Sequence, residues 1–76
     1  MTDVLFPQMS SDKEQTGVIT TWFVETGDQV TPATLIAEVA VEKAAAEVHP
    51  ETSGVITILE EENKELAQGA VIARVT

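Results

Sequence analysis

A four-residue motif occurs twice in this chain, and the repeat limits how the chain can fold. Gly17-Val18-Ile19-Thr20 recurs 37 positions later as Gly54-Val55-Ile56-Thr57. A second pair of matching segments, residues 35–39 and 71–75, is separated by 36 positions. A duplicated unit of this length predicts two similar halves that are related by an approximate twofold axis.

The two halves differ at two places. When the two halves are aligned, Gly27 of the first half matches Asn63 of the second, and the second half lacks one residue at this place. Both residue types adopt positive φ at low cost in tight turns. Upstream, Phe6-Pro7 matches His49-Pro50, but the first half then has six extra residues before its glycine, in the polar segment 8–16. We therefore expect a turn at Gly27 and Asn63, and a long loop in the first half alone.

The segments inside each half have the pattern of β-strands. Residues 18–24 are mostly β-branched or aromatic, with Val18, Thr20 and Trp22 on one side of an extended chain. Trp22 is expected to face the core in preference to Phe23, its neighbour on the opposite side. Residues 35–41, 55–59 and 70–75 behave similarly, and glycine, proline and asparagine separate these segments.

Two segments have a helical composition. Residues 41–48 and 60–67 are rich in alanine and glutamate, which favour helix by propensity. Each would make only about two turns, and isolated helices of that length are marginal. The repeat also aligns the second segment with a strand end and a turn. We therefore predict an all-β fold, either a sandwich or a flattened barrel.

Composition limits the classes of partner. The chain has 76 residues, 43% of them hydrophobic, and no cysteine, which predicts one small domain without disulfides or thiolate metal sites. A net charge of −9 disfavours nucleic acid and anionic membranes, and suits either a basic protein surface or simple solubility. No apolar run approaches the ~20 residues of a membrane span, and the start lacks a secretory signal. We expect a soluble intracellular domain.

Lys43 is one of four basic residues and has Glu38, Glu42 and Glu47 around it in the sequence. If residues 35–41 and 45–48 form a hairpin, Glu42, Lys43 and Ala44 lie at its tip, where a large partner can reach them. By composition alone, Lys43 would be an ordinary solvated lysine. Catalytic amines are usually activated by burial or by a cationic neighbour, and the sequence indicates neither here, which favours an acceptor over a Schiff-base catalyst.

A series of motifs at fixed spacing surrounds this lysine. The motifs are Gly17-Val18-Ile19, Trp22, Glu25-Thr26-Gly27-Asp28-Gln29-Val30, Leu35-Ile36-Ala37-Glu38-Val39, Glu42-Lys43-Ala44, Glu47-Val48 and Ser53-Gly54-Val55-Ile56. The series resembles the lipoyl domain family over residues 4–75. The resemblance implies a flattened barrel of two four-stranded antiparallel sheets with pseudo-twofold symmetry, with the acceptor lysine on a hairpin turn. The family commonly has aspartate where Glu42 stands.

The resemblance implies a non-catalytic swinging-arm carrier with lipoate bound covalently to Lys43, and with Glu42 and Ala44 as the context that a lipoate–protein ligase reads. Such domains serve 2-oxo acid dehydrogenase complexes. Their partners are a thiamine-dependent decarboxylase, an acyltransferase core and a dihydrolipoamide dehydrogenase. On this basis residues 1–76 would be one carrier domain, monomeric by itself and excised from the N-terminus of a longer dihydrolipoamide acyltransferase. Its location would be the bacterial cytoplasm or the mitochondrial matrix.

Two alternatives stay open at this stage. Biotinyl domains share the fold and modify a hairpin lysine, but their lysine typically lies between two methionines, whereas Met1 and Met9 are distant from Lys43 in the sequence. This favours lipoyl over the biotinyl domain of a carboxylase. Some lipoyl-like hairpins carry no modification and act as interaction surfaces.

The sequence gives weaker predictions for the loop 8–16 and for the candidate metal ligands. In the family, the loop that corresponds to residues 8–16 lies near the lysine hairpin and helps the decarboxylase to choose its carrier. The residues that could take this role are Ser10, Ser11, Asp12, Lys13, Glu14 and Gln15, and the alternative is a mobile polar loop. We expect no metal site, because His49 has no neighbouring ligand and Glu60-Glu61-Glu62 lacks the spacing of a calcium loop.

Overall fold

Eight β-strands form the regular structure of the described residues. The computed structural model describes residues 1–12 and 14–76, with no helix among them and hence no helix that could span a membrane. The strands are β1 (Thr2–Leu5), β2 (Thr16–Trp22), β3 (Gln29–Val30), β4 (Ala37–Val41), β5 (Ala44–Val48), β6 (Gly54–Ile58), β7 (Glu65–Ala67) and β8 (Val71–Val75). The segments 41–48 and 60–67 are therefore strand and turn, as the repeat predicted and as propensity alone did not.

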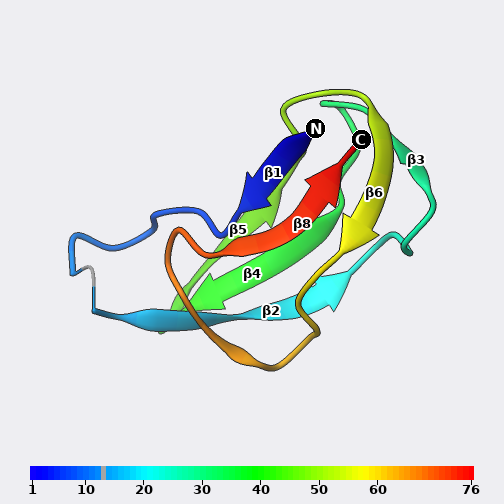
Figure 1. Ribbon diagram of the computed structural model, residues 1–76. Helices are drawn as coiled ribbons and strands as arrows, with labels where there is room; N and C mark the ends of the chain where they lie inside the picture. Colours follow the sequence, from blue (N-terminus) through cyan, green and yellow to red (C-terminus); the bar gives the residue numbers. More distant parts are fainter. Residues whose placement is uncertain (13) are drawn as a thin grey trace.

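The strands form two four-stranded antiparallel sheets, which confirms the predicted fold class. Their orders are β1-β8-β6-β3 and β5-β4-β2-β7. Exchanging each strand of the first half for its counterpart in the second, β1 for β5 through β4 for β8, converts one order into the other. The sequence repeat is thus also a repeat of topology, and each sheet takes two strands from each half (Figure 1).

The core follows the same symmetry. Side chains at equivalent positions of the two halves are fully buried, among them Ile19 with Ile56, Ile36 with Ile72, Ala37 with Ala73, and Val39 with Val75. Each of the eight strands contributes at least one buried hydrophobic residue to this cluster. Burial of these groups is the main stabilising term available to a domain without disulfides.

The repeated glycines allow neighbouring strands of the same sheet to approach each other closely, β2 with β4 and β6 with β8. A Cβ atom at Gly17 would lie 2.5 Å from the carbonyl oxygen of Ala40 and 2.7 Å from Phe6 Cζ. A Cβ atom at Gly54 would lie 2.5 Å from the carbonyl oxygen of Thr76. Both positions are too crowded for any side chain, which explains why the motif begins with glycine in each half.

The predicted alternation along β2 is wrong at its centre. Ile19 faces the core with no exposed surface and Val18 is half-buried, although the sequence pattern placed Val18 on the same side as Trp22. The register between β2 and β4 shifts between Ile19 and Thr21, which inserts an extra residue and reverses the facing of the later residues of the strand. Trp22 therefore packs against the core as expected, half-buried, whereas Phe23 is 52% exposed.

The predicted turns are confirmed by backbone geometry. Gly27 has φ 100° and Asn63 has φ 63°. Both have the positive φ that the sequence predicted for turns at these two residues. The Asn63 turn is also tied to β2, because the amide of Asn63 donates to the carbonyl of Ile19 and the indole N–H of Trp22 donates to the carbonyl of Glu60.

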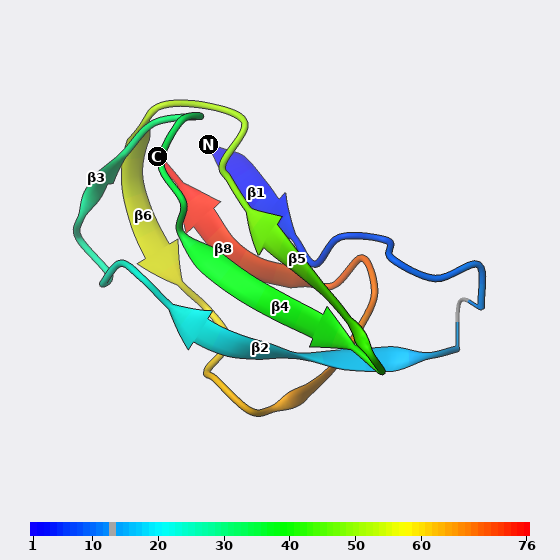
Figure 2. The same cartoon turned by 180° about the vertical axis from the view of Figure 1, so that it is seen from behind.

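The chain termini and the turn between β4 and β5 lie at opposite ends of the molecule. The N-terminus and the C-terminus lie together at one end, because Thr2 of β1 pairs with Val75 of β8. The turn between β4 and β5 lies at the opposite end, close to the start of β2 and to the long loop that precedes it (Figure 2). The long axis of the molecule is 32 Å, so the predicted acceptor turn is well separated from both termini.

Candidate functional site

The acceptor turn consists of two residues, Glu42 and Lys43. Strands β4 and β5 pair from Ala37 with Val48 down to Val41 with Ala44, which leaves these two residues as the connection. The sequence had placed Ala44 in the tip as well, but Ala44 is the first residue of β5 and pairs with Val41. Glu42, Lys43 and Ala44 are all exposed, whereas Val41 immediately before them is buried. The hairpin thus holds the lysine outward on a rigid base.

Glu42 has an unusual backbone conformation. Its φ of 53° lies in the left-handed region, which a side chain other than that of glycine, asparagine or aspartate adopts at a cost of roughly 1–2 kcal/mol. Because the cross-strand pairs on both sides of the turn are fixed, this strained residue sets the direction in which the chain passes Lys43.

We expect Glu42→Asn to stabilise the domain by about 1 kcal/mol, since asparagine tolerates the left-handed region. In a protein of this size the gain corresponds to a rise in melting temperature of about 4–8 °C. Glu47→Asn removes the same charge from an exposed position within β5 and serves as the control. An equal rise in both variants would assign the effect to charge and would remove the case for strain at the turn.

The amine of Lys43 is not engaged by the part of the protein that the structure describes. No hydrogen bond or ion pair among residues 1–12 and 14–76 involves it. Lys64 differs, because its amine donates to the Glu60 carboxylate at 2.8 Å. That hydrogen bond, followed by the charge of Glu60, raises the pKa of Lys64 above its ordinary value. Lys43 is the one of these two amines that is presented without an intramolecular partner in the described structure.

Carboxylates surround the hairpin. Glu38 of β4 and Glu47 of β5 are direct cross-strand partners, and like charges in that arrangement repel each other. The hydroxyl of Thr20 donates to the carbonyl of Glu38 at 3.0 Å. Together with Glu42, the pair makes this face of the hairpin anionic, which would favour a partner with a basic surface.

A groove runs between the acceptor turn and the long loop. Its volume is about 350 Å³, and it is lined by Met9, Ser10, Gln15, Val41, Glu42, Lys43 and Ala44. The structure therefore brings two of the predicted loop residues, Ser10 and Gln15, to the acceptor lysine. Ser11, Asp12 and Glu14 are exposed and do not line this groove, and Lys13 lies outside the described residues.

The loop has its own hydrogen bonds. The Ser10 hydroxyl donates to Gln15 Oε1 at 3.0 Å and accepts from the amide of Asp12 at 3.1 Å, while Asp12 Oδ1 accepts from the amide of Glu14. The described part of the loop is thus a folded segment.

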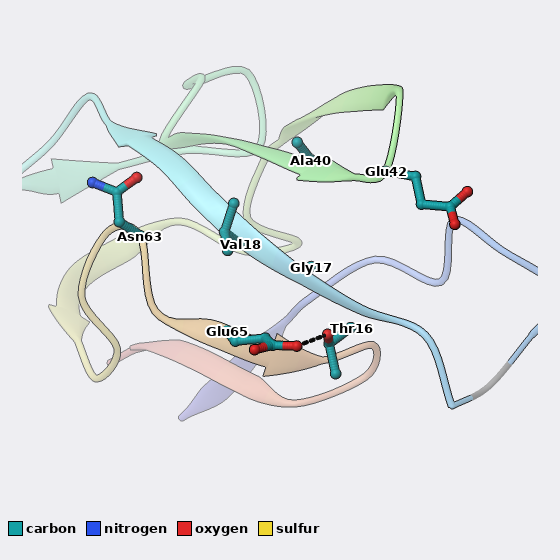
Figure 3. Close-up of a pocket in the computed structure, with 7 residues that line it drawn as sticks. All are labelled: Thr16, Gly17, Val18, Ala40, Glu42, Asn63 and Glu65. Atoms are coloured by element: carbon teal, nitrogen blue, oxygen red, sulfur yellow. Dashed lines mark hydrogen bonds between the residues drawn. The ribbon is translucent and has the colours of Figure 1, made fainter.

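A second groove of about 340 Å³ also reaches Glu42. Its lining comes from β2, the end of β4 and the segment leading into β7, and comprises Thr16, Gly17, Val18, Ala40, Glu42, Asn63 and Glu65. In Figure 3, Glu42 of the acceptor turn lies at one end of this groove and Asn63 lies at the other, with the Thr16 hydroxyl donating to Glu65 between them. Glu42 is therefore the residue that the two grooves share.

The residues considered for metal binding have other contacts. Nδ1 of His49 lies 3.1 Å from the carbonyl oxygen of Thr34. Glu60 binds Lys64, and Glu62 accepts a hydrogen bond from the amide of Trp22 at 2.6 Å. In the described ranges 1–12 and 14–76, no group of three or more acidic, histidine or cysteine side chains is arranged to hold a metal ion.

Two residues of the site escaped sequence reasoning. Met9 was placed in the loop but not among its functional candidates, and it lines the groove beside Lys43. Gln68, in the turn between β7 and β8, hydrogen-bonds to the loop from more than 50 positions away in the sequence. Met9 directly precedes the predicted candidates, residues 10–15, so extending that range by one residue would have included it. No feature of the sequence around Gln68 indicates its role.

Comparison with known proteins agrees with this geometry. The family model described as "Biotin-requiring enzyme" matches residues 2–75, nearly the whole chain. No curated protein and no solved structure gave a match. The two pseudosymmetric sheets and the exposed hairpin lysine are the features expected of that family. The chain belongs to the biotin/lipoyl attachment family, whose domains are non-catalytic carriers of a biotin or lipoate group bound covalently to a lysine.

Proposed function

We propose that this domain is a lipoyl carrier and that Lys43 is its attachment site. The observation that carries the proposal is the position of Lys43, exposed in a two-residue turn at the end of the molecule remote from both termini. A tether attached there can sweep through space without striking the body of the domain, and a chain continuing beyond either terminus would not obstruct it.

The residues at the turn fit an amide-linked cofactor. Attachment forms a bond between Lys43 Nζ and the carbonyl carbon of an activated lipoate, while the bond from that carbon to the activating group breaks and the ammonium loses two protons, one before the attack and one after it. The amine has no partner to give up in the described structure, and it becomes neutral, so the net charge moves from −9 to −10 by the loss of one positive charge. Glu42 and Ala44 flank it and would be the residues that the ligase reads.

The bound lipoyl group supplies a redox-active disulfide that accepts acyl groups and electrons. The domain contributes position. Its hairpin fixes the base of the arm, its exposed turn allows the arm to enter a partner active site, and the tether raises the effective concentration at each site. Because the hairpin strands are fully paired, the arm pivots on its own bonds and not on a flexible loop.

The flanks of Lys43 support lipoate over biotin. They are Glu42 and Ala44, whereas biotinyl domains typically have methionine on both sides of the acceptor. One structural observation favours the alternative: Met9 lies in the same groove as Lys43, although it is distant in sequence. A biotinyl carrier of a carboxylase is therefore the second candidate, and a lipoyl-like interaction module without modification is a third.

The wider assignment follows from the lipoyl proposal. The domain would serve a 2-oxo acid dehydrogenase complex, as part of a dihydrolipoamide acyltransferase in the bacterial cytoplasm or the mitochondrial matrix. Its partners would be a lipoate–protein ligase, a thiamine-dependent decarboxylase, the acyltransferase core and dihydrolipoamide dehydrogenase. The anionic face formed by Glu38, Glu42 and Glu47 suits a basic docking surface on any of them.

Incubation with purified ligases tests the choice of cofactor. One sample receives lipoate–protein ligase, lipoate and ATP, and another receives biotin–protein ligase, biotin and ATP, with intact mass as the measurement. We expect one lipoyl group to be added in the first and little or no change in the second. Addition of biotin alone would establish the biotinyl alternative, and no adduct in either sample would favour the unmodified module.

A further inference from the structure

One side chain ties the loop beside Lys43 to the opposite half of the sequence. Gln68 lies between β7 and β8, and its Oε1 accepts hydrogen bonds from the amides of Met9 at 2.7 Å and Ser10 at 2.8 Å. Its Nε2 donates to the carbonyl of Asp12 at 3.1 Å and to that of Gln15 at 2.9 Å. Four backbone groups of the loop thus converge on one amide.

These contacts use the full bonding capacity of the side chain. A glutamine amide has two acceptor positions and two N–H donors, and all four have partners here. The chemistry of the partners also fixes the orientation, because two N–H groups require the oxygen on one side and two carbonyls require the nitrogen on the other. Gln68 therefore has one orientation that satisfies the loop, and the loop backbone has matching partners at both of its ends.

The clamped residues are the ones that form the groove. Met9, Ser10 and Gln15 line it on the loop side, and each of them gives a backbone group to Gln68. The turn that carries Gln68 is itself held to the start of the loop, since the amide of Gly69 donates to the carbonyl of Phe6 and the amide of Phe6 donates to that of Ala70. The position of the loop wall is thus set by the β7–β8 turn.

We propose that Gln68 is a positioning residue, which holds Met9, Ser10 and Gln15 against the Lys43 turn so that the decarboxylase recognises a preformed groove. The inference rests on the proposed lipoyl function and extends it to the choice of partner. A loop that is ordered before the encounter loses less conformational entropy on binding, so releasing it weakens the complex without altering the cofactor or its attachment.

Two substitutions separate positioning from attachment. Gln68→Ala removes all four hydrogen bonds, and Gln68→Glu keeps the shape but turns a carboxylate oxygen toward the carbonyls of Asp12 and Gln15. Gln29→Ala is the matched control, because Gln29 is an exposed glutamine on β3, away from the hairpin end of the molecule (Figure 2). Each protein is lipoylated and then assayed for reductive acylation with three purified decarboxylases. These are specific for pyruvate, for 2-oxoglutarate and for branched-chain 2-oxo acids.

With the decarboxylase that acylates the unsubstituted domain, we expect both Gln68 variants to raise KM about tenfold or more, as loss of a well-placed contact region does, with kcat little changed. The Gln29 variant should behave as the unsubstituted domain. All four proteins should reach full lipoylation, and amide hydrogen exchange at Met9 and Ser10 should be faster in the two Gln68 variants alone.

The outcomes distinguish the two levels of the proposal. If the unsubstituted domain takes up no lipoate, the proposed function fails. If it is lipoylated but acylated by none of the three decarboxylases, or if the Gln68 variants match Gln29→Ala in KM, the positioning role fails and lipoyl attachment stands. A fall in kcat at unchanged KM, or a lower melting temperature with unchanged kinetics, would reduce Gln68 to a structural residue.

Discussion

Lys43→Arg is expected to abolish attachment of the cofactor completely. Arginine keeps the positive charge and the exposed position, but its guanidinium cannot take the place of the amine nucleophile in forming the amide. The measurement is intact mass after incubation with lipoate–protein ligase, lipoate and ATP. Because the turn makes no hydrogen bond through the Lys43 amine in the described structure, the variant should fold and unfold as the parent does.

Lys64→Arg is the matched control for that experiment. Lys64 is also an exposed lysine near carboxylates, but its amine is paired with Glu60 at 2.8 Å in a turn of the opposite half. We expect this variant to be modified to the same extent as the parent. An adduct that survives Lys43→Arg and disappears in Lys64→Arg would move the attachment site to the second turn and would overturn the assignment.

Exposure alone is not expected to be sufficient for modification. Exchanging the two turn residues, by Glu42→Lys together with Lys43→Glu, keeps composition and charge but moves the amine by one position. Position 42 has φ 53°, so the side chain there leaves the turn in a different direction. A misplacement of about 1 Å can reduce an enzymatic rate by about a hundredfold, and we expect the ligase rate to fall by at least about tenfold.

Much of this fold could be predicted because the sequence contains an internal repeat, so each half supports the interpretation of the other. The repeat aligned Gly27 with Asn63, and both have positive φ. It also aligned residues 60–67 with a strand end and a turn, where propensity indicated a helix. A helix of eight residues gains little stability unless packing supports it. The pairing of buried residues such as Ile36 and Ile72 follows from the same alignment.

The features that the sequence did not predict depend on contacts between distant segments. The bulge in β2 puts Trp22 on the same side of the strand as Ile19, against simple alternation, because β4 opposes two residues of β2 with one, which no local pattern reveals. The site shows the same limit. Lys43 could be found from its neighbours, whereas Gln68 acts through hydrogen bonds to residues 53–59 positions away.

Gly17→Ala is expected to destabilise the domain strongly. The added methyl group would lie 2.5 Å from the Ala40 carbonyl oxygen and 2.7 Å from both Phe6 Cζ and Val41 Cγ2, and backbone atoms cannot rotate away. Overpacking of this kind costs about 1–3 kcal/mol, and the melting temperature of a domain of this size falls by about 4–8 °C for each kcal/mol. Thr57→Ala on the exposed side of β6 should change stability by less than about 0.5 kcal/mol.

Gly54→Ala should destabilise the domain by a similar amount. The equivalence of the two halves can therefore be tested by comparing the two losses in free energy of unfolding. The methyl group added at Gly54 would meet the Thr76 carbonyl oxygen at 2.5 Å and Val75 Cγ1 at 2.8 Å, neither of which is among the atoms that crowd Gly17. Substitutions without shared partners usually add to within about 0.5 kcal/mol, so the double variant should lose the sum of the two single losses in denaturant unfolding. A loss well below that sum would mean that a shift of the strands that relieves one crowded contact also relieves the other. The two glycines would then act as one coupled constraint on the spacing of neighbouring strands, and not as two independent ones.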